Sequence, residues 1–145
     1  MRIEEATAAT PDVVAAVQRL VPQVSSSATV PTEGEIAEIV ASPATVLLLA
    51  RDEASEVIAM LTLALFRIPT GLRAWIEDVV TEAAAQRQGA GTALTEEALR
   101  RAAAAGARTV DLTSRASREA ANRLYQRVGF ELRDTNVYRC EIEAE

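Results

Sequence analysis

The sequence has no histidine and no lysine, and it has a single cysteine, Cys140. Without histidine, Ser-His-Asp and Cys-His mechanisms and the common zinc sites are excluded. Without lysine, a Schiff-base lysine and the lysine of a P-loop are excluded. One cysteine forms neither an internal disulfide nor a cysteine metal cluster, and its alternating context YRCEIE is typical of a strand residue. We therefore expect no metal, and acid–base chemistry is left to carboxylates, tyrosine, cysteine, arginine-assisted water or the backbone.

Long apolar runs and an excess of positive charge are also missing. The longest apolar run, residues 45–50, is far shorter than the roughly 20 residues of a membrane span. The N-terminus lacks the basic start and apolar stretch of a signal peptide. The net charge of −6 disfavours a nucleic-acid backbone as partner and is compatible with a cationic substrate. We therefore expect a cytoplasmic protein that binds neither nucleic acid nor membrane.

The remaining patterns fit one domain over residues 1–145. Helical spacing of apolar residues predicts helices over 11–23, 32–41, 89–105 and 117–128. Alternating or short apolar runs predict strands over 2–7, 44–51, 56–67, 72–81, 109–113, 130–133 and 137–142. This order predicts an α/β (α+β) fold, with a mixed central sheet of about seven strands and helices on both faces. The strand–helix–strand unit over 72–113 is expected to be parallel.

The most informative segment runs from Ile76 to Leu99, where a strand leads through the turn QRQGAGT into a helix. Gly89 and Gly91 remove side chains where the backbone has to approach a ligand. The first N–H groups of a helix are unpaired, and the helix dipole places about half a positive charge there. The turn is therefore suited to a phosphate or pyrophosphate. A Rossmann fingerprint is excluded because its third glycine position is Leu94.

This turn resembles the acyl-CoA motif Q/R-x-x-G-x-G/A of the GNAT superfamily of N-acetyltransferases, with Gln86, Gly89 and Gly91 at the motif positions. The segment NRLYQRVGFE, residues 122–131, is similar to the late helix of that family and its LY-x-x-x-GF ending. Neither motif is specific alone, but the two occur in the family's order. The resemblance covers residues 76–130 by motif and the whole chain by the order of its elements.

The resemblance implies transfer of an acetyl group from acetyl-CoA directly to a primary amine of a small molecule or peptide. It implies that backbone groups of Val79, Val80 and Thr81 pair with the pantetheine arm. It also implies that the pyrophosphate lies at the turn and the start of the helix, formed by Gln86, Arg87, Gln88, Gly89, Ala90, Gly91 and Thr92. Many relatives carry an asparagine where this chain has Arg118, and Asn122 lies one helical turn later. Either residue is expected to contact CoA, and a homodimer is an open possibility because relatives often pair.

Glu77 and Tyr125 are the candidate catalytic residues. A phenol with a pKa of about 10 can protonate a departing thiolate, which suits Tyr125; its alternative role is packing in the core. Glu77 is the candidate base, acting directly or through water. The neighbouring Asp78 points to the opposite face of a regular strand and remains the alternative base. The string IEDVV resembles the segment of glucosamine-phosphate acetyltransferases whose acids serve the acceptor site.

The acceptor pocket is expected from two loop segments, residues 23–27 and 66–75. A second interpretation of the sequence is a non-catalytic acyl-CoA-binding module, acting as a sensor or partner protein. The two interpretations differ in one observation: the module binds CoA without turning it over.

Overall fold

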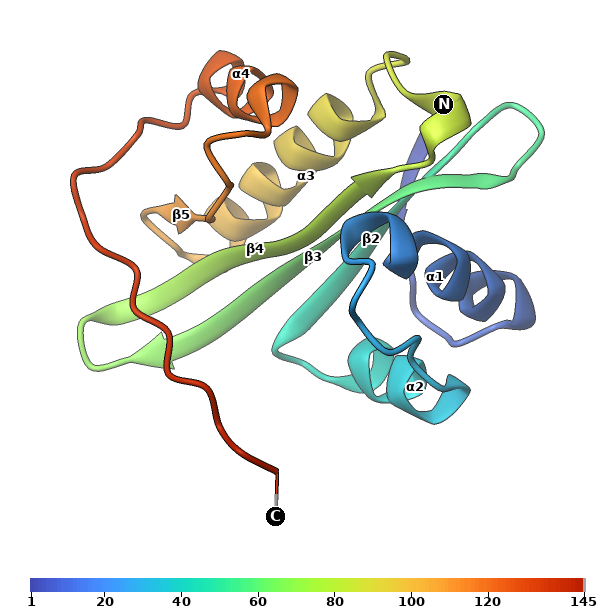
Figure 1. Ribbon diagram of the computed structural model, residues 1–145, viewed down its shortest axis with the longest axis horizontal. Coiled ribbons are helices and arrows are strands. Elements are labelled where there is room, and N and C mark those ends of the chain that lie inside the picture. Colours follow the sequence, from blue (N-terminus) through green and yellow to red (C-terminus); the bar gives the residue numbers. More distant parts are fainter. Residues whose placement is uncertain (145) are drawn as a thin grey trace.

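The computed structural model describes residues 1–144 and shows a five-stranded sheet with helices on both faces (Figure 1). The strands lie in the order β1-β2-β3-β4-β5; β1 to β4 are antiparallel neighbours, and β5 runs parallel to β4. The elements in chain order are β1 (Arg2–Glu5), α1 (Pro11–Val24), α2 (Glu33–Ala41), β2 (Thr45–Arg51), β3 (Val57–Ile68), β4 (Gly71–Thr81), the 3-10 turn η1 (Ala83–Ala85), α3 (Ala90–Ala105), β5 (Val110–Asp111) and α4 (Glu119–Val128). The mixed fold predicted from the sequence is confirmed.

The first two helices begin at threonine caps. The Thr10 hydroxyl accepts a hydrogen bond of 3.3 Å from the backbone N–H of Val13. At α2, Thr32 and Glu35 form a reciprocal capping box with bonds of 3.0 and 3.2 Å. Such caps satisfy N–H groups that have no partner inside the helix, which is why these helices begin where the sequence predicts.

The sheet separates two apolar cores. On one face, buried residues of β2, β3 and β4 such as Leu61 and Ile76 pack against Leu94 and Ala98 of α3. On the other face, α1 and α2 cover residues that include Leu49 and Met60. None of the helices in the described part of the chain is long and apolar enough to cross a membrane.

The two closing strands predicted over residues 130–133 and 137–142 are not formed within residues 1–144. After Phe130 the chain carries no helix or strand, and we call residues 131–144 the C-terminal arm. Its apolar side chains are open to solvent: Leu132 is 91% exposed and Tyr138 is 89% exposed. The sheet therefore has five strands rather than about seven. Alternation predicts an extended chain, but a strand also needs a neighbour for its backbone hydrogen bonds.

Candidate active site

Strand β4 contains a bulge next to the acidic pair. Glu77 lies opposite Thr62 of β3, and Val80 lies opposite Met60. Three steps along β4 thus face two steps along β3, so β4 carries one extra residue. Asp78 has a φ of +50°, in the left-handed region that residues other than glycine rarely adopt.

The bulge reverses which residues of β4 face which core. Ile76 packs in the core on the α3 side, whereas Val80, four residues on, packs in the core on the α1 and α2 side. In a regular strand these two side chains would lie on the same face. Val79 packs against the α3 side instead. The regular alternation predicted along β4 is therefore interrupted at the bulge, and the placement of Glu77 and Asp78 on opposite faces stays a prediction.

Beyond the bulge, one edge of β4 has no neighbouring strand. β5 pairs with β4 at only two positions, Ala74 with Val110 and Trp75 with Asp111. From Ile76 to Thr81, β4 pairs with β3 on one side and with no described strand on the other. Backbone groups on an open edge can pair with an added extended chain.

This open edge leads through η1 to the start of α3. Arg87 has a φ of +71° and Gly89, the N-cap residue, has a φ of +84°. No side chain caps the helix, and the N–H of Ala93 is the first to reach a helical carbonyl, that of Gly89. The N–H groups of Ala90, Gly91 and Thr92 therefore have no partner within the helix. Left-handed residues next to free N–H groups make a concavity that binds anions.

The two glycines of this turn are needed for different reasons. A Cβ on Gly89 would meet nothing within 4 Å, so its positive φ is what favours glycine. A Cβ on Gly91 would lie 3.1 Å from Cδ1 of Leu124 and 3.9 Å from Oγ1 of Thr81. Gly91 therefore lets α4 and the end of β4 meet the start of α3.

Tyr125 lies on α4 with only 8% of its surface exposed. Its ring packs edge to face on Phe130, with the centroids 5.8 Å apart. Burial raises the pKa of Tyr125, and the positive charge of Arg118 opposes that rise. Its hydroxyl makes no hydrogen bond with any other described residue. Tyr125 is thus both a packing residue, the alternative role predicted from the sequence, and a phenol that keeps its proton at neutral pH.

Comparison with known protein families shows to which family the chain belongs. The profile of the acetyltransferase (GNAT) family matches residues 15–130, which is most of the chain. The chain belongs to the GNAT acetyltransferase family. A comparison with curated proteins gives no match.

Solved structures share the GNAT fold over nearly the whole chain. One, from Agrobacterium tumefaciens and named as an acetyltransferase, is 22% identical over 97% of this chain and 100% of that chain, with a TM-score of 0.85. A transcriptional regulator from Bacillus halodurans is 24% identical over 97% and 99%, with a TM-score of 0.81. An aminoglycoside acetyltransferase from an uncultured soil sample is 17% identical over 99% and 96%, with a TM-score of 0.84. At these identities the matches establish the fold.

In this GNAT domain, the two candidate CoA contacts on α4 differ in what they already bind. Asn122 donates from Nδ2 to the carbonyls of Arg115 and Arg118, at 2.9 and 2.8 Å. Its amide donors thus hold the loop before α4. Arg118 is the N-cap residue of α4; its side chain is exposed and forms no ion pair within residues 1–144. The geometry favours Arg118 over Asn122 as a residue free to reach a ligand.

The residues of the α3 turn that are predicted to bind the pyrophosphate differ in how exposed their side chains are. Gln86, Arg87 and Gln88 are exposed, whereas the side chain of Ala90 is buried beneath the helix. Ala90 and Thr92 can therefore present backbone N–H groups to a ligand while their side chains serve other contacts.

Of the two acidic residues at the bulge, Glu77 is held in place by a hydrogen bond. The Trp75 indole donates from Nε1 to Oε1 of Glu77 at 2.6 Å, and both acids are exposed. Desolvation by the surrounding protein atoms raises the pKa of Asp78, although its side chain is exposed, and the negative charge of Glu77 adds to that rise. Two carboxyls with different environments are therefore available where β4 bulges.

Glu82, just after β4, is a residue whose role the sequence did not reveal. Its carboxylate accepts hydrogen bonds of 2.9 Å from Arg19 and from Gln23, both on α1. Arg19 also donates to the carbonyl of Val57 at 2.7 Å, and the backbone N–H of Ala83 donates to Gln23 at 3.1 Å. These contacts fix the chain between the open edge and the α3 turn. They join residues about 60 positions apart, and no local pattern signals such a pairing.

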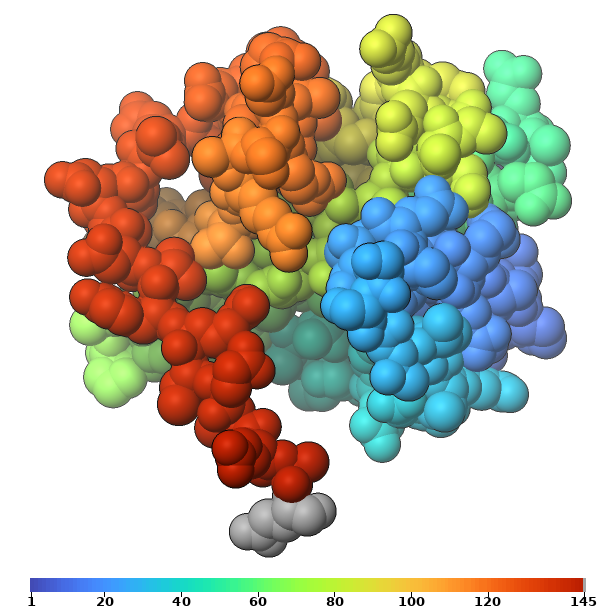
Figure 2. Space-filling view, viewed as in Figure 1, coloured from blue at the N-terminus to red at the C-terminus, as the bar shows by residue number. Residues whose placement is uncertain are grey.

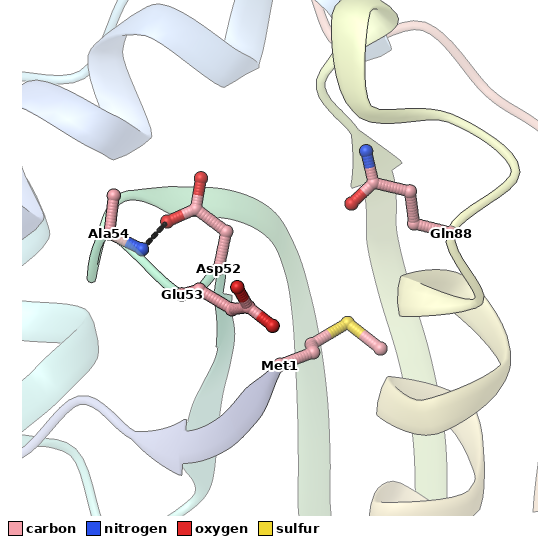
Figure 3. A pocket seen from close by; sticks show the side chains of 5 residues that line it. All are labelled: Met1, Asp52, Glu53, Ala54 and Gln88. Carbon is pink, nitrogen blue, oxygen red and sulfur yellow. Dashed lines mark hydrogen bonds between the residues drawn. The ribbon is translucent and has the colours of Figure 1, made fainter.

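A hollow of about 400 Å³ lies beside the α3 turn but does not suit an anion. Its lining comes from Met1, Gln88 and the turn Asp52, Glu53 and Ala54 between β2 and β3 (Figure 3). Asp52 uses one carboxylate oxygen to accept from the N–H of Ala54 at 2.9 Å. Two carboxylates would repel a pyrophosphate, so we place no part of the site there. Within residues 1–144, no group of three or more acidic or cysteine side chains is gathered to hold a metal ion.

Proposed function

We propose that this GNAT protein transfers an acetyl group from acetyl-CoA to a primary amine. The observation that carries the proposal is the continuity of two features: the unpaired edge of β4 after its bulge, and the unpartnered N–H groups at the start of α3. An extended amide chain that ends in a pyrophosphate matches both. Acetyl-CoA has that form, with its thioester at the far end of the chain.

The backbone would supply most of the binding. Backbone groups of Val79, Val80 and Thr81 would pair with the amides of the pantetheine arm, as an added strand pairs with a sheet edge. The pyrophosphate would lie on the N–H groups from Gln88 to Thr92, with the side chains of Gln86 and Arg87 exposed next to it. Arg118, whose side chain is exposed at the start of α4, would add a positive charge near the nucleotide.

Acetyl transfer forms one C–N bond and breaks one C–S bond. The acceptor ammonium first loses a proton, and its nitrogen lone pair then attacks the thioester carbonyl. The resulting tetrahedral oxyanion would be stabilised by a backbone N–H on the bulged strand. Collapse expels the CoA thiolate, the nitrogen loses a second proton, and the thiolate takes up one. The products are an amide, CoA and one net proton.

Two side chains would carry these proton movements. Tyr125 would protonate the departing thiolate, because burial keeps its phenol protonated at neutral pH. Glu77 would take protons from the amine, directly or through water, with its carboxylate oriented by Trp75. Asp78 remains the alternative base, because its raised pKa also suits proton uptake.

The acceptor is best described as a cationic amine. Glu77 and Asp78 place negative charge at the bulge, and the whole chain carries −6. Two structural neighbours are aminoglycoside acetyltransferases, one from soil and one from Acinetobacter haemolyticus. Aminoglycosides therefore belong in a panel of acceptors with polyamines, amino acids and peptide N-termini.

The test is release of CoA thiol from acetyl-CoA in the presence of each amine, with mass spectrometry of the acetylated product. We expect amine-dependent release that is lost in the Tyr125→Phe variant. Binding of acetyl-CoA without release on any amine would instead favour the non-catalytic module. Absence of binding would contradict both functions.

A further inference from the structure

A cation, an aromatic ring and an acid follow one another on one face of β4, just before the bulge. Arg73, Trp75 and Glu77 are each two residues apart, so their side chains point to the same side of the strand. The residues between them, Ala74 and Ile76, are buried in the core on the α3 side. The row of three side chains therefore lies on the opposite face of the sheet, the one that carries α1 and α2.

The two helices leave this part of the sheet face open. On β3, the partners of the three residues are Phe66, Ala64 and Thr62. Phe66 is 44% exposed and Ala64 is half-buried, and within residues 1–144 neither packs in the apolar core beneath α1 and α2. In Figure 2 atoms of β4, in green, are visible between α1, in blue, and the C-terminal arm, in red. The open surface thus combines two aromatic side chains, those of Phe66 and Trp75, with the small Ala64.

The two ends of the row carry opposite charge. Nε1 of Trp75 donates to the Glu77 carboxylate at 2.6 Å, and the guanidinium of Arg73 lies 5.7 Å from the centre of the same ring. The indole therefore separates a negative group from a positive one. At the usual rise of a strand the Cα atoms of Arg73 and Glu77 are about 13 Å apart. Both charged groups lean toward Trp75, so they lie closer together than their Cα atoms.

Arg73 has hydrogen-bond donors left for a ligand. Its one ion pair within residues 1–144 is with Asp111 of β5, and the nitrogen and oxygen are 3.6 Å apart, which is longer than a hydrogen bond. The Arg73 side chain is 42% exposed. A guanidinium carries five N–H donors and binds a carboxylate through two of them. Because Asp111 offsets part of its charge, Arg73 suits a single carboxylate better than a doubly charged phosphate.

We propose that the acceptor carries a carboxylate at the opposite end of an apolar chain from its primary amine. The amine lies at Glu77, the chain lies along Trp75 and Phe66, and the carboxylate binds Arg73. An ω-amino acid of medium length has this form. A diamine does not, because its second ammonium would be repelled by Arg73. The inference rests on the proposed acetyl transfer and narrows its acceptor.

Three amines of equal length separate the contributions in the CoA-release assay: ω-aminohexanoate, hexylamine and hexamethylenediamine. We expect kcat/KM for ω-aminohexanoate to exceed that for hexylamine by about tenfold, the effect of one charge-assisted pair. Arg73→Glu should invert the preference between ω-aminohexanoate and the diamine, because the new carboxylate attracts the second ammonium. The readout is the ratio of the two kcat/KM values, in which a general loss of activity cancels.

Arg67→Glu is the matched control for this charge reversal. Arg67 is an exposed arginine of the same hairpin, but it follows Phe66 on β3 and so points to the other face of the sheet. The variant should keep the order of preference of the parent. A length series from ω-aminobutyrate to ω-aminooctanoate, measured with both proteins, identifies the chain that spans the row.

Trp75 is the only tryptophan of the chain, so its fluorescence reports binding without any chemistry. Each ω-amino acid is titrated in the presence of free CoA, which has no acetyl group to transfer. We expect a saturable change in emission for the parent and a Kd about tenfold higher for Arg73→Gln. Hexylamine lacks the carboxylate, so its Kd should be the same for both proteins.

The two readouts distinguish this inference from the proposed function. An emission change that depends on Arg73, without CoA release on any amine, would contradict acetyl transfer and support the binding site. CoA release that prefers hexylamine or the diamine to every ω-amino acid of the series would support acetyl transfer and overturn the inference. Emission that none of these amino acids changes, or equal affinities in the parent and Arg73→Gln, would also overturn it.

Discussion

Glu77 accepts a hydrogen bond of 2.6 Å from the indole nitrogen of Trp75, two residues earlier on β4. The indole is itself covered by the guanidinium of Arg73, 5.7 Å from the ring. Residues two apart share a face of a strand, so the ring and the carboxylate lie on the same side of β4. The aromatic ring thus holds the candidate base in one direction at the edge of the bulge.

Replacement of Glu77 by glutamine tests this base. Glutamine can still accept the bond from Trp75 but cannot take a proton, so we expect kcat/KM at neutral pH to fall by about 100-fold or more. The matched variant Asp78→Asn should reduce it much less. A larger loss from Asp78→Asn than from Glu77→Gln in the same pH–rate series would transfer the role to Asp78.

Tyr125→Phe removes the proposed proton donor and keeps the ring that packs on Phe130. We expect kcat to fall by about 100-fold, with acetyl-CoA affinity and melting temperature little changed. Tyr138→Phe, on the exposed arm, is the matched control and should leave kcat as it is. An unchanged kcat for Tyr125→Phe in steady-state assays would leave the tyrosine with a packing role only.

Gly91→Ala should weaken acetyl-CoA binding. The new methyl would lie 3.1 Å from Leu124, so α4 has to move relative to the turn that presents the N–H groups. Gly34→Ala in α2 is the control, since its nearest neighbour would be 3.9 Å away and alanine in a helix is favoured by about 0.5–1 kcal/mol. We expect a higher Kd for Gly91→Ala by calorimetry and no change for Gly34→Ala. Equal affinities in all three proteins would show that the turn tolerates this shift.

Glu82→Gln should lower stability in a pH-dependent way. Hydrogen bonds from Arg19 and then Gln23 hold the pKa of Glu82 below its ordinary value of 4.5. A carboxyl with a lowered pKa in the folded state stabilises the fold above its unfolded pKa, and this contribution is lost as pH falls through the folded pKa. The melting temperature of the variant should therefore lie below that of the parent at neutral pH.

The two melting curves should converge at acidic pH, below the folded pKa of Glu82. Glu56→Gln is the control, because Glu56 is exposed and forms no ion pair among the described residues. A deficit for Glu82→Gln that is the same at acidic and neutral pH would mean that packing, and not the charge of Glu82, matters.

The sequence predicts those parts of the fold whose causes are local. Thr10 and Thr32 cap their helices as expected, and Gly106 and Gly129 end theirs with positive φ. The α3 turn is also visible, because two glycines between a strand and a helix indicate a positive φ or a close approach of the backbone. These features depend on residues only a few positions apart.

The parts that escape prediction depend on distant partners. The bulge at Asp78 exists only relative to the register of β3, and nothing in IEDVV marks an extra residue. The contacts of Glu82 join two segments about 60 residues apart. The C-terminal arm has the alternation of a strand, but whether it pairs depends on the edge of a strand that lies far away in the sequence. Exposure and pairing are properties of the folded chain, and local pattern does not determine them.

Titration of the full chain with acetyl-CoA in a calorimeter tests the central claim most directly. If the open edge of β4 and the free N–H groups of α3 bind the pantetheine and pyrophosphate together, the titration gives saturable heat. Pantetheine alone and pyrophosphate alone then bind far more weakly. A folded protein that gives no heat with acetyl-CoA at millimolar concentration would contradict the account.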